Sequence, residues 1–88
     1  MQEKRIAAKT LTDTEESLYN SDLGAIVKTI LLYNNNDTEQ EVTLNIDGVT
    51  FLFKLSSKET KILNIPLVVN SLKAKGNEIN IHISAIQL

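Results

Sequence analysis

Residues 41–55 form a pattern typical of one β-hairpin, and this pattern constrains the fold more than any other part of the chain. Apolar and polar side chains alternate on both sides of the dipeptide Asp47-Gly48. Asp-Gly readily supplies the positive φ angles of a two-residue type I′ turn. The register set by this turn places three apolar pairs on one buried surface: Ile46 with Val49, Leu44 with Phe51, and Val42 with Phe53.

Several other segments have strand character, bounded by residues that favour turns. They cover residues 6–11, 17–19, 24–33, 59–65, 67–69, 71–75 and 79–88. Short strands joined by turns predict an all-β fold, a single-domain antiparallel β-sandwich or small jelly roll of about seven or eight strands. We expect one domain over residues 1–88 and leave open a flexible arm at residues 1–5.

Three details refine this prediction. Residues 24–33 are apolar on both faces, which is typical of a strand covered on both sides. Residues 34–38 should end that strand, and Pro66 should lie at a sheet edge or a bend. Residues 12–15 have the spacing of a helix capping box, so a helical turn is the alternative there.

The charge of the chain argues against a nucleic-acid partner, because the net charge is only −2. The charges are unevenly distributed, with a balance of −5 over residues 1–48 and +3 over residues 49–88. If the two halves lay on different faces, this polarity would steer contacts between copies. A solvated surface without a partner is the simpler interpretation of the charge alone.

The sequence offers little machinery for catalysis. It contains no cysteine, which excludes a thiolate nucleophile, and its one histidine, His82, excludes a histidine metal pair. His82 occupies an outward position of an alternating strand, so we expect it to be a solvated or interface residue. Residues 34–41 are rich in oxygen donors but lack the spacing of a calcium loop. We therefore expect no enzyme activity, no cofactor and no metal site.

Two tyrosines are the candidate interface residues. Tyr19 and Tyr33 are amphipathic and suit the rim of a contact surface, whereas both phenylalanines are needed for the core. The sequence shows no apolar signal-peptide core and no stretch of membrane-spanning length. We expect synthesis in the cytoplasm and no membrane partner.

From Lys9 onward the order of features resembles small tailed-bacteriophage virion proteins. The resemblance rests on four segments: Ser17-Leu18-Tyr19-Asn20-Ser21, residues 25–34, Val42-Thr43-Leu44 and Pro66-Leu67-Val68. It implies a non-enzymatic β-sandwich subunit of a capsid, neck or tail, such as a capsid decoration or head-tail accessory protein. Such a subunit would form a homo-oligomer, with a trimer as one option, would bind other virion proteins, and would be assembled in the bacterial host cytoplasm.

A carbohydrate- or receptor-binding β-sandwich is the alternative function. It predicts a concave face on which Tyr19 or Tyr33 is exposed beside asparagine or aspartate side chains. A small hydrolase is the least favoured hypothesis, since one histidine and no cysteine leave few groups to activate a nucleophile.

Overall fold

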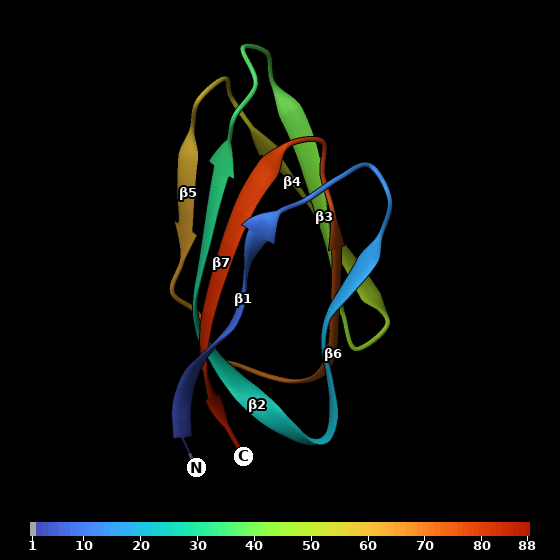
Figure 1. Ribbon diagram of the computed structural model, residues 1–88, viewed down its shortest axis with the longest axis vertical. Helices are drawn as coiled ribbons and strands as arrows, with labels where there is room; N and C mark the ends of the chain where they lie inside the picture. Colours follow the sequence, from blue (N-terminus) through green and yellow to red (C-terminus); the bar gives the residue numbers. More distant parts are fainter. Residues whose placement is uncertain (1) are drawn as a thin grey trace.

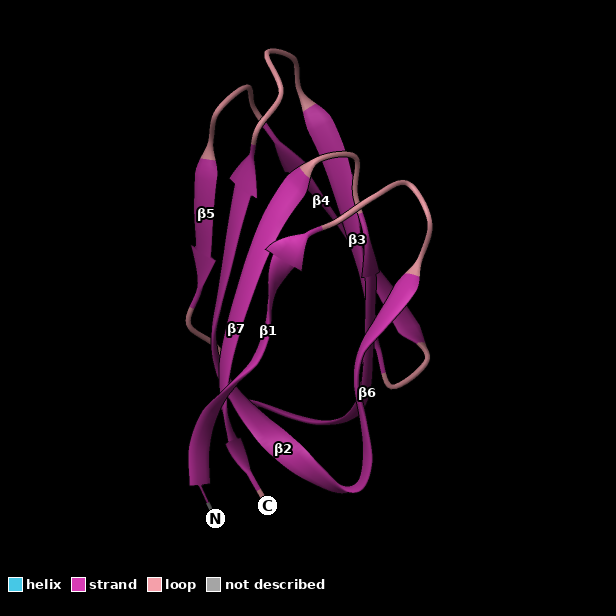
Figure 2. Ribbon diagram, in the orientation of Figure 1, coloured by secondary structure: helices cyan, strands magenta, loops and turns pink. Residues whose placement is uncertain are grey.

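The computed structural model describes residues 2–88 and is built from β-strands without any helix. Seven strands follow one another along the chain: β1 (Gln2–Thr10), β2 (Glu16–Asn34), β3 (Gln40–Ile46), β4 (Val49–Leu55), β5 (Thr60–Leu63), β6 (Leu67–Lys75) and β7 (Ile79–Gln87). All their pairings are antiparallel. The predicted all-β antiparallel fold is therefore confirmed (Figure 2).

The strands form one hydrogen-bonded path, β1-β7-β2-β6-β3-β4, with β5 added beside β2. This path folds over into two layers, as in a β-sandwich (Figure 1). We call β1, β7, the C-terminal part of β2 and β5 the terminal layer, because both chain ends lie there. The N-terminal part of β2 with β6, β3 and β4 is the hairpin layer.

The long strand β2 joins the two layers. Residues 25–27 pair with β6 on one side and with β7 on the other. The expected strands at residues 17–19 and 24–33 are therefore parts of one long strand, β2. The expected segments at residues 67–69 and 71–75 are likewise parts of one strand, β6. Acidic and basic halves of the sequence consequently interleave, so they do not occupy separate faces.

A β-bulge at Lys28 changes which side chains of β2 face the core. The register shifts between Val27 and Thr29, so Val27 points inward before the bulge and Ile30 and Leu32 point inward after it. Leu31 lies on the outer face and is 38% exposed. The expectation that both faces of this strand are covered is wrong, because Val27, Ile30 and Leu32 face the core whereas, within residues 2–88, no second layer covers Leu31 on the outer face.

The predicted hairpin is confirmed in register and turn. Val42, Leu44 and Ile46 pair with Phe53, Phe51 and Val49, as the alternation requires. Asp47 and Gly48 have φ angles of 52° and 89°, which suit a type I′ turn. The buried surface is only half complete, however: Val42 and Leu44 are fully buried, whereas Phe51 is 47% exposed, because β4 is an edge strand.

The core lies between the two layers and is filled mainly by branched aliphatic side chains. Its largest members are Leu11, Ile30, Leu32, Leu44, Leu55, Leu72, Ile79 and Ile83. In the sequence, Ile79, Ile81 and Ile83 alternate with polar residues, which predicts that these isoleucines point inward, and all three are buried in β7. Pro66 lies in the connection between β5 and β6 and belongs to neither strand.

The ends of the first strand differ from two sequence-based alternatives. Gln2 to Arg5, where the sequence allows a flexible arm, pair with β7, and Met1 lies outside the described residues. The segment after β1 contains a bend instead of a helical turn, so the capping-box alternative is wrong. There the Thr12 hydroxyl accepts a hydrogen bond from the Thr14 amide at 3.3 Å, a local contact that competes with helix formation.

Candidate interaction surfaces

Tyr33 lies on the outer face of the terminal layer, half-buried near the end of β2. It is paired with Asn80 of β7 and Thr60 of β5. The next outward position, Leu31, is paired with His82 and Ile62. Except for Ile62, these side chains border a shallow hollow of about 370 Å³, in which an aromatic ring and apolar side chains lie beside amide and hydroxyl groups. The exposed part of this face suits either a protein contact or a polar ligand.

The apolar part of this outer face is formed by neighbouring strands. Ile62 is 57% exposed and lies directly opposite Leu31. On the other side of Leu31, the half-buried His82 lies opposite Ala8 of β1. We call Ala8, Leu31, Tyr33, Ile62 and His82 the outer patch. Residues directly opposite one another in a sheet share a face, so the patch continues across four strands.

Tyr19 occupies a different environment near the start of β2. Its ring is partly buried against the core, and its hydroxyl donates a hydrogen bond to the Gly24 carbonyl at 3.0 Å. This bond ties the ends of the irregular segment in which β2 departs from regular pairing with β6. The two candidate tyrosines lie near opposite ends of β2 and do not share one surface. The role of Tyr19 in an interface stays a prediction, and its hydroxyl serves a structural contact.

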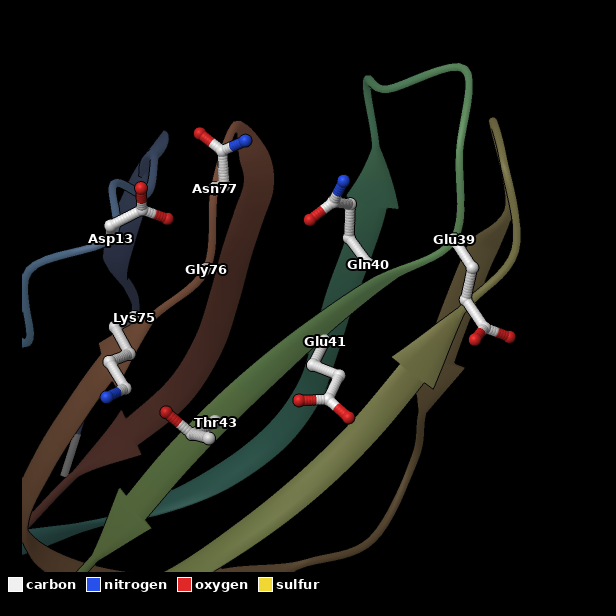
Figure 3. Close-up of a pocket in the computed structure, with 8 residues that line it drawn as sticks. All are labelled: Asp13, Glu39, Gln40, Glu41, Thr43, Lys75, Gly76 and Asn77. Carbon is white, nitrogen blue, oxygen red and sulfur yellow. The ribbon is translucent and has the colours of Figure 1, made fainter.

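A polar pocket of about 500 Å³ opens at the end of the sandwich away from the termini (Figure 3). It is lined by Asp13, Glu39, Gln40, Glu41, Thr43, Lys75, Gly76 and Asn77. The three carboxyl groups point in different directions in Figure 3. Among the described residues, no group of three or more histidine, cysteine, aspartate or glutamate side chains is placed to hold a metal ion. The Thr43 hydroxyl is buried and has no hydrogen-bond partner within residues 2–88, but the pocket lining shows no paired acid and base.

One carboxyl group has a shifted acidity. A hydrogen bond and the positive charge of Lys28 hold the pKa of Glu3 below its ordinary value of 4.5. This ion pair joins the exposed start of β1 to the bulge of β2. Because Glu3 and Lys28 are both exposed, their ion pair is a local surface contact.

An apolar cleft of about 350 Å³ opens along the side of the sandwich between the β4 and β5 edges. Its walls are wholly apolar: Ile30, Leu44, Ile46, Val49, Phe51, Phe53, Leu63, Ile65 and Leu67. Val49, Phe51 and Ile65 are 55%, 47% and 57% exposed, so the cleft is accessible to a partner. We call these residues the edge cleft.

Sequence reasoning missed the edge cleft and one buried polar residue. Alternation places the phenylalanines in the core because it identifies which face a side chain takes, but not whether another layer covers that face. For Asn34, the sequence predicts only the end of a strand. The residue is fully buried, and its amide connects the turn after β2 with the turn after β4, a role that the run of asparagines after β2 could have suggested.

Comparisons with protein-family models, with curated proteins and with solved structures found no match. Among the described residues there is also no helix whose length and hydropathy would let it cross a membrane. The surfaces themselves and the resemblance seen in the sequence are therefore the grounds for a function.

Proposed function

We propose that this protein is a non-enzymatic structural subunit of a phage or prophage particle, which self-associates and docks on a capsid, neck or tail. The sequence resemblance to small tailed-phage virion proteins supports this proposal. The distribution of exposed apolar side chains supports it independently, since large apolar patches on small proteins mark contact surfaces.

The observation that carries the proposal is the grouping of exposed apolar residues. In residues 2–88, nine large hydrophobic side chains are 38–72% exposed, and most belong to two surfaces, the outer patch and the edge cleft with its β4 strand. Single exposed hydrophobic residues are ordinary, but two contiguous surfaces on one small domain are not. Two surfaces let a subunit contact a copy of itself and a different virion protein at the same time.

The size of the domain gives self-association a further benefit. A chain of 88 residues buries a modest core and is marginally stable by itself. Any partner that binds only the folded state raises its stability by mass action. Covering the edge cleft would complete the apolar surface that β4 leaves half open.

Mass spectrometry of purified particles from the phage or induced prophage that encodes the chain tests this proposal. We expect the protein to copurify with particles through a density gradient in many copies per particle. Its presence in the lysate together with its absence from intact particles would contradict the proposal.

A carbohydrate- or receptor-binding module is the second candidate function. The observation in its favour is the combination of Tyr33 with the amide of Asn80 and the hydroxyl of Thr10 in one hollow. Thr10 donates a hydrogen bond to Asn80 at 2.7 Å, so the polar groups are held in place. Retention of the protein on immobilised glycans, lost on Tyr33→Ala substitution, would favour this function.

A further inference from the structure

We propose that the β4 edge pairs with β4 of a second copy of this chain, antiparallel and centred on Leu52, so that the two hairpin layers become one continuous sheet. This inference rests on the proposed function, because it specifies how the subunit self-associates. Three features of β4 support it: its free edge, its backbone hydrogen-bonding groups and the symmetry of its side chains.

The first observation is that β4 lacks the features that normally protect a sheet edge. Of the strands that the structure describes, it pairs only with β3, without a register shift, and its one charged residue is Lys54. The other edges are protected: β1 carries several charges and a bulge, β5 has only four residues, and the N-terminal part of β2 is broken by register shifts. An unprotected, regular and apolar edge favours pairing with another strand.

The backbone of β4 determines which registers are favourable. In a two-residue hairpin, the residues that flank the turn exchange hydrogen bonds, and such pairs alternate along the ladder. Because Ile46 pairs with Val49, the amide and carbonyl groups of Thr50, Leu52 and Lys54 point away from β3. A twofold axis at Leu52 places Leu52 opposite its own copy and Thr50 opposite Lys54. All three outward-facing residues then find partners.

The side chains of β4 are self-complementary in the same register. From Val49 to Leu55 the strand reads apolar, polar, Phe, Leu, Phe, polar, apolar, which is a chemical palindrome about Leu52. The twofold arrangement opposes Phe51 to Phe53 of the second copy, an aromatic pair that is favourable in sheets. Lys54 faces an uncharged threonine, so no like charges are opposed. This match is the reason for assigning a second copy, and not a different partner, to this edge.

The proposed pairing also brings exposed apolar side chains of the two copies into contact. Phe51 and Phe53 line the edge cleft, and those of the second copy would extend this apolar wall from the same face of the joined sheet. Leu52, which is 53% exposed on the opposite face, would contact its own copy at the axis. The interface is predominantly apolar, and its association should therefore depend little on salt.

Single-cysteine variants test the pairing and its register, because the natural chain contains no cysteine. Opposed residues in a hydrogen-bonded antiparallel pair have Cα atoms about 5.5 Å apart, within the range of a disulfide. The L52C variant should therefore form a covalent dimer under mild oxidation. T50C is the matched control, since four residues of strand separate the two introduced thiols by about 14 Å. The double variant T50C/K54C should cross-link again.

A charge variant tests the same interface without oxidation. In Leu52→Lys, two ammonium groups meet at the twofold axis, and the dimer dissociation constant should rise about tenfold or more. Val68→Lys is the control, because Val68 is an apolar residue of β6 that is 67% exposed and belongs to neither the outer patch nor the edge cleft. Circular dichroism would show whether each variant is folded, and Val68→Lys should keep the parent dimer constant.

The outcomes separate this inference from the proposed function. Equal cross-linking of L52C and T50C would overturn the register, and a parent oligomer unaffected by Leu52→Lys would overturn β4 pairing while leaving self-association intact. A discrete trimer would also contradict the twofold pairing of β4, but it would leave self-association intact. A parent protein that is monomeric at every concentration and absent from particles would contradict both proposals.

Discussion

Replacing Asn34 by alanine should destabilise the fold strongly, because this one polar side chain bonds to two separate turns. The Asn34 side chain is fully buried at the end of β2. Its Nδ2 donates to the carbonyls of Thr38, Leu55 and Ser56 at 2.9, 3.2 and 3.1 Å. Its Oδ1 accepts from the backbone and side-chain amides of Asn36, both at 2.8 Å. One side chain therefore holds together the turn after β2 and the turn after β4.

The expected loss follows from which partners water can reach. Two to three neutral hydrogen bonds contribute about 1 kcal/mol each, and a buried carbonyl left without a donor costs about 1 kcal/mol or more. The Leu55 carbonyl is the one in buried surroundings, whereas Thr38 and Ser56 are exposed and can bind water. We expect Asn34→Ala to lower the free energy of unfolding by about 3–4 kcal/mol, and Tm by about 12–30 °C.

Urea unfolding followed by far-ultraviolet circular dichroism measures this effect, since the chain has no tryptophan. Asn64→Ala is the matched control: Asn64 is exposed and accepts one hydrogen bond from the Thr29 hydroxyl at 3.1 Å. Asn64→Ala should lower the free energy of unfolding by less than about 1 kcal/mol. Equal destabilisation by the two substitutions would mean that Asn34 does not organise these turns.

Three further predictions concern the turn, the outer patch and the ion pair. Gly48→Val should lower the free energy of unfolding by about 1–2 kcal/mol, because φ of Gly48 is 89° and a β-branched residue is strained there. An added Cβ would meet no atom within 4 Å, so the loss is purely conformational. An unchanged urea midpoint would refute the turn assignment. Tyr33→Ala should leave folding and the dimer intact but reduce incorporation into particles, and unchanged incorporation would remove Tyr33 from the docking surface. The pKa of Glu3, measured by NMR titration, should lie below the ordinary glutamate value and return to it in Lys28→Met. Because the pKa of Glu3 is lowered on folding, the ion pair stabilises the folded state at pH values above the ordinary glutamate pKa, and this stabilisation is lost as the pH falls through the lowered pKa. A Glu3 titration unaffected by Lys28→Met would contradict the pairing.

The hairpin was predictable because its information is local. Asp47-Gly48 fixes the turn, and strict alternation fixes the register, so the three apolar pairs follow without knowledge of the rest of the fold. The inward side of β7 was predictable for the same reason, since its isoleucines alternate without interruption.

The path of β2 was not predictable from such local patterns. A bulge at Lys28 reverses the alternation, and the apolar residues of this segment then resemble a strand buried on both faces. Only the pairing of residues 25–27 with both β6 and β7 shows that the strand passes between layers. These contacts are distant in sequence, and a single chain carries no direct signal for them.

The candidate surfaces also combine features that local sequence patterns predict with features that depend on contacts distant in sequence. The outward position of His82 followed from alternation, and the structure places it beside Leu31 and near Tyr33. The exposure of β4 depends on which strand ends the hairpin layer, and therefore on topology. Sequence alone identified the apolar residues of β4 but placed them in a complete core.

Self-association is the property on which both proposals depend, and the solution mass of the purified parent protein reports it. Size-exclusion chromatography with light scattering, performed over a range of protein and salt concentrations, would measure this mass. We predict a discrete dimer that forms with increasing protein concentration and persists at high salt, because the paired β4 surfaces are apolar. A strict monomer at every concentration would contradict self-association through β4.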